Sequence, residues 1–266
     1  MQTLKHDEQN YLEYRDTPWD QRTFGFRCNE ILSTHASGEV EARLLLADFE
    51  RSCEGERVQF SYTRIPAGNR ILKAAFYGAG YYITECSLDV MVSVKDFRCP
   101  VAYGSVPMHI EEATEDDLPA LRQIAADSFD YSRMHEDFNI PPPLARLRYS
   151  RWIDDLWAQK KIFHVHREEG KPIWFNVFEI TPDHSIHSIV GGSARGMGLF
   201  SYAACAFSLD YCRKQGIKRM FTTISAANLG VMNMHFSLNY KVVASYYGFH
   251  RHRVMQTGEV STVAKK

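Results

Sequence analysis

The sequence predicts a mixed α/β protein, and three observations lead to this fold class. Stretches with the 3.6-residue period of a helix alternate with stretches that have the two-residue period of a strand, along all 266 residues. Hydrophobic residues make up 45% and charged residues 24%, which is typical of a globular chain with a buried core. A glycine-rich turn also joins an apolar strand-like run to a long helical pattern. The length fits one or two domains at roughly 150 residues each, and a break near residues 99–107 predicts a smaller domain at 1–104 and a larger one at 105–266.

Helical and strand patterns alternate through the first 104 residues. Val40, Leu44 and Ala47 form one apolar stripe at helical spacing, which Leu45 and Phe49 widen. These patterns predict helices at 40–53 and 66–78 and strands at 24–32, 58–65 and 81–94.

The remaining residues have clearer boundary signals. Thr114 is a predicted N-cap because three acidic residues follow it, in the first turn, where the helix dipole favours them. Gly216 is a predicted C-terminal glycine for the helix before it. The helices expected here are 118–129, 144–157, 199–215 and 229–238, and the strands are 108–113, 161–167, 173–180, 188–191, 219–224 and 240–250.

Charge and cysteine usage exclude several classes of partner. Lysine plus arginine number 31 against 32 acidic residues, so no basic excess favours nucleic acid or an anionic membrane. The six cysteines form no C-x-x-C pair, the first residues have no apolar signal core, and the longest stretch without charged residues, 221–240, is too polar to span a bilayer. A reduced cytoplasmic location is therefore expected. No metal is expected either, because these histidines have no cysteine or acidic partner at ligand spacing: His164, His166, His184 and His187.

An internal repeat is visible around two asparagines. Asn69 is followed by an aromatic residue at seven positions and Tyr81 at twelve, and Asn228 is followed by His235 at seven and Tyr240 at twelve. The repeat is either a coincidence between two amphipathic helices or the trace of two related α/β halves, the first of which has lost its ligand turn.

The glycine-rich turn, V-G-G-S-A-R-G-M-G at 190–198, carries the strongest chemical signal. Backbone amides at a helix N-terminus lack partners and attract anions, and glycine lets a phosphate approach the main chain. The backbone of Arg195, Gly196, Met197, Gly198 and Leu199 is therefore a candidate pyrophosphate cradle, although glycine turns also serve tight packing. The order of residues matches neither a dinucleotide fingerprint nor a P-loop.

The order of these motifs resembles the GNAT superfamily of acyl-CoA N-acyltransferases. The matching features are a strand, the R-G-x-G turn, a helix ending in R-K-Q-G at 213–216, a strand, and a turn asparagine before a short helix. Three further motifs, W-D-x-x-x-F-G at 19–25, S-R-M-H-x-D at 132–137 and Y-x-x-W-I at 149–153, resemble the branch typified by dTDP-fucosamine acetyltransferase, which acylates nucleotide-linked amino sugars.

The resemblance implies a fold, a co-substrate and a reaction. The larger domain would have the GNAT fold, with middle strands splayed to admit pantetheine, and the smaller would be a partial GNAT-like domain. Acyl-CoA, with acetyl or 3-hydroxybutanoyl as the acyl group, would be the co-substrate. The backbone of Ile189, Val190 and Gly191 would pair with pantetheine, and the acceptor amine would attack the thioester directly, without an acyl-enzyme.

The same resemblance implies an acceptor and its binding residues. The acceptor would be a dTDP-linked 3- or 4-amino-dideoxysugar used for surface polysaccharide or glycan assembly, and a homodimer would fit the family. Tyr149 and Trp152 are also compatible with core packing, and Asp137 is also compatible with capping a turn. Arg148 and Arg151 are further candidates for phosphate binding, but they are also compatible with solvated charges on a helix. The substrate-binding residues implied are Ser132, Arg133, Asp137, Tyr149 and Trp152. The strand residue Asn176 is a further candidate, because its side chain could point into the acceptor cleft.

Two positions depart from the family pattern. Phe200 stands where a small residue is usual, and its bulk would narrow the phosphate cradle. His235 stands where the family has a tyrosine that protonates the departing thiolate, and a histidine has a pKa of about 6.5 against about 10 for a phenol. His235, with the turn residue Asn228, is therefore a candidate catalytic residue, and the role of His235 as acid, base or packing residue is open. Asn228 is also a candidate cofactor-binding residue.

Two other functions compete with sugar acylation. One is N-acetylation of a protein or peptide, which leaves the block at 132–152 unexplained. The other is a non-catalytic acyl-CoA-binding module, which the departures at Phe200 and His235 motivate.

Overall fold

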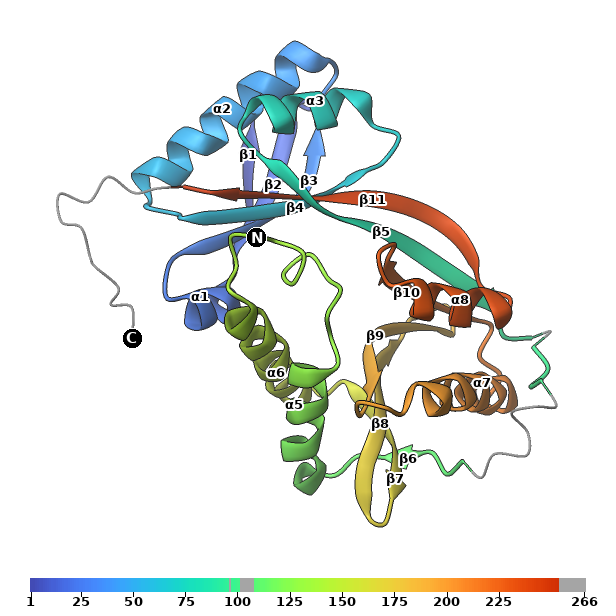
Figure 1. The fold of residues 1–266 in the computed structure, drawn as a ribbon. Coiled ribbons are helices and arrows are strands. Elements are labelled where there is room, and N and C mark those ends of the chain that lie inside the picture. The colour runs from blue at the N-terminus through green and yellow to red at the C-terminus, as the bar shows by residue number, and fades with distance from the viewer. Residues whose placement is uncertain (96, 101–107, 254–266) are drawn as a thin grey trace. The chain divides into compact units, whose positions relative to one another are not determined.

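The computed structural model describes residues 1–95, 97–100 and 108–253, and the chain forms two compact units (Figure 1). The first unit comprises Met1–Ile65, Asn69–Tyr82 and the chain from Phe249 onward, and the second comprises Pro66–Gly68 and Ile83–Gly248. The long strands β5 (Tyr82–Ser93) and β11 (Lys241–His252) contribute residues to both units. The predicted boundary between residues 104 and 105 lies outside the described residues.

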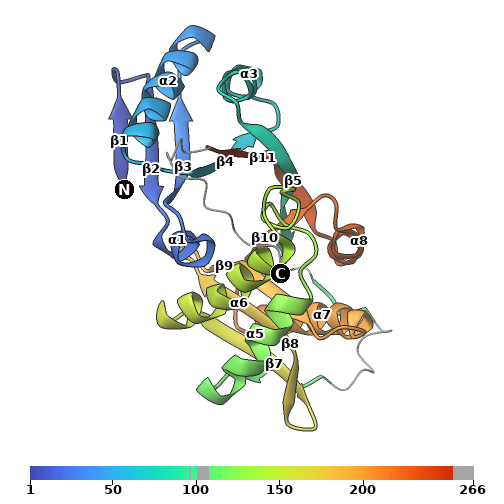
Figure 2. The same ribbon diagram turned by 60° about the vertical axis from the view of Figure 1, so that its left-hand side comes forward.

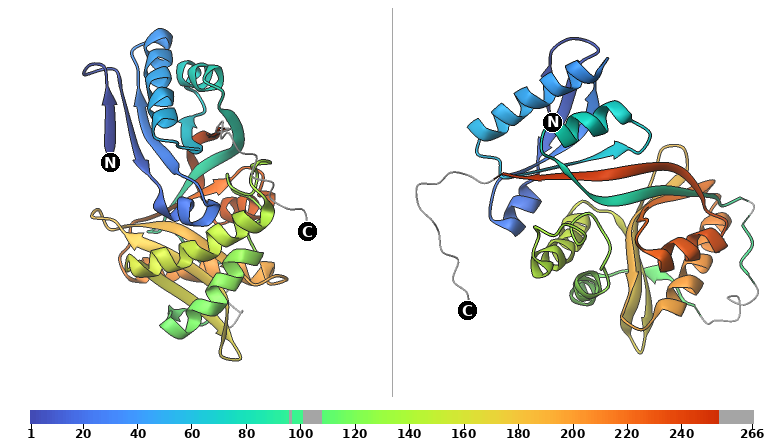
Figure 3. Two further views of the ribbon diagram at one scale, coloured as in Figure 1. Left: turned by 90° about the vertical axis from the view of Figure 1, so that its left-hand side faces the viewer. Right: turned by 45° about the horizontal axis from the view of Figure 1, so that its top comes forward.

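Strands of the first unit are antiparallel except for one pair. β1 (Gln2–Lys5), β2 (Tyr11–Asp16) and β3 (Cys28–His35) pair in that order as antiparallel strands, and β3 pairs with β4 (Phe60–Pro66) as a parallel strand. A crossover helix, α2 (Glu39–Gly55), connects the parallel strands, as a parallel pair requires. Helix α3 (Arg70–Gly78) packs beside α2 (Figure 3).

Three expectations for this unit were wrong. Pro18–Phe24 forms helix α1 where a strand was predicted to begin at residue 24: Pro18 fits the first helical turn, and Gly25, at φ +82°, ends the helix. The predictions also missed β1 and β2. On α2 the buried face is centred on Leu45, Leu46 and Phe49, whereas Val40 and Leu44 are 65% and 54% exposed.

The second unit is a sheet covered by helices on both faces. Its strands lie in the order β5-β10-β9-β8-β7-β6, with β11 on the other side of β5. Helices α5 (Leu118–Asp127) and α6 (Pro142–Ala158) lie on one face, and α7 (Gly198–Lys214) and α8 (Leu229–Ser237) lie on the other (Figures 1 and 2). The remaining strands are β6 (Glu111–Glu112), β7 (Ile162–Glu168), β8 (Lys171–Ile180), β9 (Ser185–Ser193) and β10 (Arg219–Ser225).

Alternation along the strands separates two cores in this unit. On β8, Phe175 and Val177 pack in the core under α5 and α6, whereas Trp174 packs against Ala203 of α7. On β10, Met220 and Ile224 belong to the core under α7 and α8. The odd-numbered residues of β10 therefore face the side of α5 and α6.

Most of the elements predicted for residues 108–253 are confirmed to within a few residues. The N-cap at Thr114 is confirmed: its backbone N–H donates to the Asp117 carboxylate at 2.7 Å, at the start of a short 3-10 turn (η1, Glu115–Asp117). Gly216 has φ +73°, the left-handed conformation expected after α7. The strand predicted at 108–113 is reduced to Glu111–Glu112. No helix among the described residues is long and apolar enough to cross a membrane.

The internal repeat is present as a structural repeat. The order β3–α2–β4–α3–β5 matches β9–α7–β10–α8–β11, and each series contains a parallel strand pair. The asparagines cap equivalent helices: Asn69 accepts the Leu72 N–H at 3.0 Å and Asn228 accepts the Val231 N–H at 3.1 Å. Both series also have a β-bulge on the first strand, where one residue lacks a partner across the ladder, and these residues are Leu32 and Ile189. Shared caps and bulges favour two related halves over coincidence.

Candidate functional site

Two parallel strands separate in the middle of the second unit. β9 and β10 pair only from Ser185 opposite Arg219 to Ser188 opposite Thr222. Beyond that point, in the described ladder, β9 continues beside β8 and β10 continues beside β5. We call this opening, between 189–193 of β9 and 223–225 of β10, the fork. The splayed strand pair implied by the sequence resemblance is therefore present, and the bulge at Ile189 lies where the strands part.

One arm of the fork is formed by β9, where a glycine lies close to the neighbouring strand β8. Gly191 lies opposite Asn176 of β8, and a Cβ atom at position 191 would be 3.1 Å from both the Asn176 Oδ1 atom and the Phe175 carbonyl oxygen. Only glycine fits there without moving a backbone atom. Val190 is buried in the core under α5 and α6, so its side chain points away from the α7 side.

The glycine-rich turn leads from the fork into α7 with the geometry of an anion site. Gly196 has φ +85°, and the Met197 N–H donates to the Ala194 carbonyl at 3.1 Å. The first turn of α7 has no acidic residue, and the Arg195 Nε–H donates to the Asp127 carbonyl at 2.8 Å. A 17-residue helix whose first turn has no acidic residue fits a pyrophosphate group at its N-terminus.

Helix α2 occupies the equivalent place in the first unit, but its N-terminus carries acidic side chains. Glu39 and Glu41 occupy its first turn, and a Cβ atom at Gly38 would be 2.7 Å from the Glu41 carboxylate. The protein's own acidic side chains thus occupy this helix N-terminus.

Phe200 does not extend into the turn as a bulky ring. It packs in the cluster of Met108 and Trp174 and stacks on His166 with ring centroids 6.2 Å apart. The side chain is therefore directed at β7 and β8, and the Phe200 ring does not narrow the phosphate cradle as expected.

A loop of residues 128–137, which we call the strap, is tied to both arms of the fork. At one end the Ser128 hydroxyl donates to the Ser193 carbonyl of β9 at 2.6 Å. At the other end the Ser225 hydroxyl of β10 donates to Glu136 Oε1 at 2.8 Å and accepts the Ala227 N–H at 3.1 Å. Because Ser225 faces the α5 and α6 side, the strap crosses the fork on that side.

Glu136 is a candidate functional residue that the sequence analysis missed. Burial raises the pKa of the Glu136 carboxyl above its ordinary value, the Ser225 hydrogen bond lowers it, and nearby Glu85 raises it. The result is a half-buried carboxylate at the end of β10 with an elevated pKa. Sequence position alone gave one signal, its place inside the S-R-M-H-x-D motif.

Four of the predicted acceptor residues, Ser132, Arg133, Asp137 and Tyr149, belong to the strap or to α6 beneath it. Ser132 Oγ lies 2.8 Å from His135 Nδ1, and the His135 ring lies 5.0 Å from the Tyr149 ring. Asp137 Oδ1 accepts the Asn139 N–H at 2.9 Å, which is the turn-capping role considered for it. The strap and α6 therefore bring these residues together in one region.

Trp152 and Tyr149 also pack as core aromatics, and Arg148 completes that packing. The two rings meet edge to face at 5.5 Å, and the Arg148 guanidinium lies 5.0 Å from the Trp152 ring centroid. Arg148 is 8% exposed, so the expectation of a solvated helix charge is wrong for this residue. Its position over the rings is a cation–π contact.

Asn176 lies away from this region. It is 8% exposed, its Oδ1 atom accepts the Ser188 hydroxyl at 2.6 Å, and it shares the α7 face of β8 with Trp174. The strap crosses the opposite face, so the structure does not bring Asn176 together with the other predicted acceptor residues.

His235 is held in one tautomer on α8. Its Nδ1 atom lies 2.8 Å from the Val231 carbonyl oxygen, which only accepts, so Nδ1 carries the proton. Burial lowers the pKa of His235, and the ring meets Tyr240 edge to face at 4.7 Å. A neutral ring protonated at Nδ1 leaves Nε2 as an acceptor, which argues against proton donation from Nε2.

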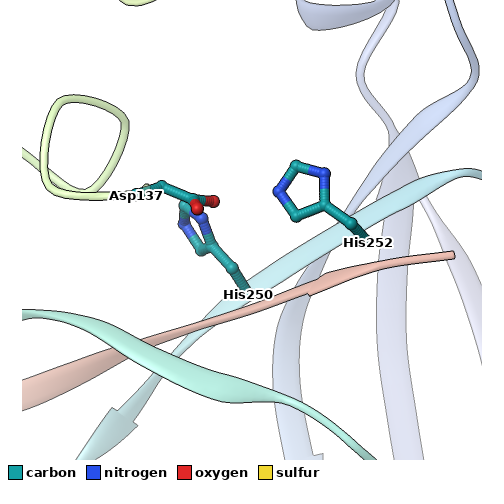
Figure 4. Close-up of side chains that lie close together, drawn as sticks. All are labelled: Asp137, His250 and His252. Atoms are coloured by element: carbon teal, nitrogen blue, oxygen red, sulfur yellow. The ribbon is translucent and has the colours of Figure 1, made fainter. Parts of the chain in front are cut away.

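Two thiols of α7 and two histidines of β11 pack against neighbouring side chains. Burial raises the pKa of the Cys205 and Cys212 thiols to about 12, so neither is a thiolate at neutral pH. On β11 of the first unit, His250 and His252 project from one face of the strand, and both rings contact Phe60, with centroids 5.0 and 4.5 Å away (Figure 4). Asp137, also labelled in Figure 4, belongs to the second unit.

Comparison with known proteins identifies the fold. No protein-family profile matches the chain, and no curated protein matches it. Among solved structures, the chain is similar to a GCN5-related N-acetyltransferase from Sphaerobacter thermophilus, with a TM-score of 0.66 and 11% identity over 92% of this chain and 76% of that one. It is also similar to the GCN5-related glucosamine N-acetyltransferase region of a fungal multi-domain β-N-acetylglucosaminidase (TM-score 0.65, 13% identity, 91% and 31% covered). A tandem GNAT protein of the clavulanic acid biosynthesis pathway is similar with a TM-score of 0.58 and 9% identity over 85% and 75% of the two chains.

These similarities define the class of fold. At such low identities they establish architecture alone, and the architecture is that of GCN5-related N-acetyltransferases, as the order of motifs predicted. The mixed α/β class is confirmed with it.

Proposed function

We propose that this protein is an acyl-CoA-dependent N-acyltransferase. The observation that carries the proposal is the fork: a parallel strand pair that separates beside a glycine turn and a helix N-terminus free of acidic residues. An extended thioester arm fits between separated strands, where unpaired backbone groups are available to it. A diphosphate fits the helix N-terminus at the end of β9.

The donor would lie along β9. Amides of the turn at 195–199, other than the Met197 amide that donates to the Ala194 carbonyl, would hold the pyrophosphate. The backbone of Ile189, Val190 and Gly191 would pair with the pantetheine arm. Gly191 is exposed and has no side chain, which supports this placement. Acetyl and 3-hydroxybutanoyl groups are both proposed donors.

The acceptor amine would enter from the strap side and attack the thioester carbon. We propose that Glu136 takes a proton from the ammonium group of the acceptor, and that the resulting neutral amine attacks. The nitrogen–carbon bond forms, the carbon–sulfur bond breaks, and the second proton lost by the nitrogen passes to the departing thiolate to give the free thiol. A carboxylate with a raised pKa on the acceptor side supports this role, since general bases work best when their pKa approaches the working pH.

His235 and Asn228 would support the site from α8. Asn228 caps α8 and thereby fixes the turn after β10. The Nδ1 hydrogen bond and the burial of His235 support a packing or proton-accepting role over protonation of the thiolate.

The acceptor we propose is an amino sugar, and its dTDP-linked form is the finer proposal. The grouping of Ser132, Arg133, Asp137 and Tyr149 around the strap supports one binding region for these motif residues. The glucosamine-acetylating region with a similar fold is compatible with an amino-sugar acceptor. The nucleotide part of the proposal rests on the resemblance of the motifs at 132–137 and 149–153, and Arg133 is its proposed phosphate contact.

A thiol-release assay tests these proposals in one experiment. Acetyl-CoA and 3-hydroxybutanoyl-CoA are paired with dTDP-linked 3-amino and 4-amino dideoxyhexoses, with glucosamine and with a panel of peptides. Release with a dTDP-sugar supports the finer proposal, and release with glucosamine alone supports amino-sugar acylation and rejects the nucleotide. Release with peptides alone assigns the competing function. Acyl-CoA binding without release from any amine rejects catalysis in favour of a binding module.

A further inference from the structure

A second cavity lies in the first unit, apart from the fork. It has a volume of about 330 Å³ and lies between α2 and α3, beside β11. Small side chains form its walls, at Ala47, Ala75, Gly78 and Ala79, and its charged lining consists of Arg43, Glu50 and Arg251. Neither the proposed reaction nor the sequence motifs use it.

Arg251 is fixed in this cavity by three neighbours. Its Nε–H faces the Glu50 carboxylate, 3.0 Å from Oε2, and its guanidinium carbon lies 5.9 Å from the centroid of the Tyr81 ring. A Cβ atom at Gly80, which has φ +82°, would be 3.4 Å from Nη1, so the absence of a side chain there makes room for the guanidinium. The terminal nitrogens of Arg251 have no acceptor among the residues that the structure describes.

The charge of Glu50 is already compensated without Arg251. Arg253, 6% exposed, donates to both carboxylate oxygens at 2.7 and 2.6 Å, and the Tyr81 hydroxyl donates to Oε1 at 2.8 Å. One carboxylate therefore faces two guanidinium groups, and the three side chains together carry a net charge of one positive unit. Arg43, at the cavity mouth, is paired with Glu39 at 2.6 Å on the surface of α2.

The structural repeat shows that this space is specific to the first unit. Counting from the capping asparagines, Ala75 and Ala79 of the first half correspond to Met234 and Leu238 of the second. Those two side chains are 8% and 1% exposed and fill the core under α7 and α8. The first half has alanine at both positions, and a cavity lies there instead.

We propose that this cavity binds a small organic oxyanion, whose phosphate or carboxylate group is held by Arg251. A planar guanidinium, whose terminal nitrogens have no acceptor in the described part of the chain, matches the paired oxygens of either group. The alanine walls would accommodate the apolar part of the same molecule. The site is independent of acyl transfer, since it lies in the other unit and uses none of the fork residues.

Calorimetric titration of the full chain with inorganic phosphate and with citrate tests the proposal, at constant ionic strength set with chloride. The wild type is expected to bind at least one of the two anions saturably, and Arg251→Gln is expected to weaken that binding at least about tenfold, since the guanidinium provides the charged hydrogen bonds. Comparison of phosphate with citrate distinguishes the two oxyanion classes.

A second variant tests the cavity without touching its charge. Ala79→Leu places at this position the side chain found in the other half, and we expect it to abolish binding while Arg251 is retained. Lys171→Gln, on the surface of the second unit, is the charge-matched control and should bind as the wild type does. The proposal would be overturned if the wild type, Arg251→Gln and Ala79→Leu bound the anion equally, which would place the anion elsewhere, for example at the glycine turn. It would also be overturned if the wild type showed no binding beyond that of chloride.

Discussion

Replacement of Glu50 should strongly destabilise the first unit. Its carboxylate is 9% exposed and receives Arg253 through two hydrogen bonds, Arg251 through one ion pair and the Tyr81 hydroxyl. Glu50→Gln keeps the shape, removes the charge and turns one acceptor into a donor that faces a guanidinium. Two arginines then lose the one carboxylate that the described residues offer them.

The size of the effect follows from the burial of these groups. Removing one partner of a buried ion pair costs about 3–5 kcal/mol, because the remaining charge stays desolvated. Arg253 is 6% exposed and does not reach bulk water, whereas Arg251 is 24% exposed and recovers part of its hydration. We therefore expect a loss of about 3 kcal/mol, the lower end of that range.

Urea unfolding, followed by circular dichroism and by hydrogen exchange of the β4 and α2 amides, measures this loss in the unit where it occurs. Glu54→Gln is the matched control, because it makes the same chemical change one turn later on α2 at an exposed position. A loss below about 1 kcal/mol for Glu50→Gln, the range typical of exposed ion pairs, would refute the reasoning.

Three further predictions concern the fork and its surroundings. Glu136→Gln should lower turnover about 10²-fold or more with acyl-CoA binding unchanged. Ser225→Ala removes a hydrogen bond that lowers the Glu136 pKa, so the acidic limb of the pH–rate profile should move to higher pH. A limb that does not move would contradict the role of Glu136 as base. Gly191→Ala should cost about 1–3 kcal/mol, because a Cβ atom 3.1 Å from the Phe175 carbonyl overpacks the strands; Gly68→Ala, with open space around it, is the urea-unfolding control. His235 has a pKa lowered by burial, so the unfolded chain binds more protons below pH of about 6.5 and stability is lost as the pH falls through that region; His235→Phe should flatten that slope in unfolding measurements between pH 5 and 7, and an identical slope would show that His235 does not contribute.

Local patterns predicted the elements of the second unit because each has its own boundary signal. The acidic turn after Thr114, the glycine at 216 and the alternation along β8 each fix a local conformation in a way that depends little on distant residues. The fork was implied by family resemblance, and no pairing rule applied to the sequence gives the residue at which β9 and β10 part.

The first unit was harder to predict because tertiary packing decides its faces. Val40 and Leu44 form an apolar stripe, but the buried face of α2 is turned toward Leu46 and Phe49, so the choice between two apolar faces is made by the sheet beneath. The charged group of Glu50, Arg251 and Arg253 joins positions about 200 residues apart, which sequence periodicity cannot relate.

Residues of the candidate site were predicted where they belong to a long sequence motif. A residue whose role depends on contacts with distant parts of the chain was missed. Ser132, Arg133 and Asp137 were selected by spacing and lie together on the strap. Glu136 stands in the same motif but gains its significance from Ser225, 89 residues away. Asn176 was selected from its strand and faces away from the strap because it shares the α7 face of β8 with Trp174, where it accepts the Ser188 hydroxyl.

The acidic first turn of α2 has a consequence for stoichiometry. The two halves share strand order, asparagine caps and bulges, and a duplicated fold of this kind would be expected to offer two diphosphate sites. Glu39 and Glu41 place negative charge at the helix end where the first half would hold its diphosphate, and like charges repel there. We therefore expect each chain to take up one equivalent of acyl-CoA, so that one copy of the duplicated fold keeps the ancestral ligand and the other is released from that constraint.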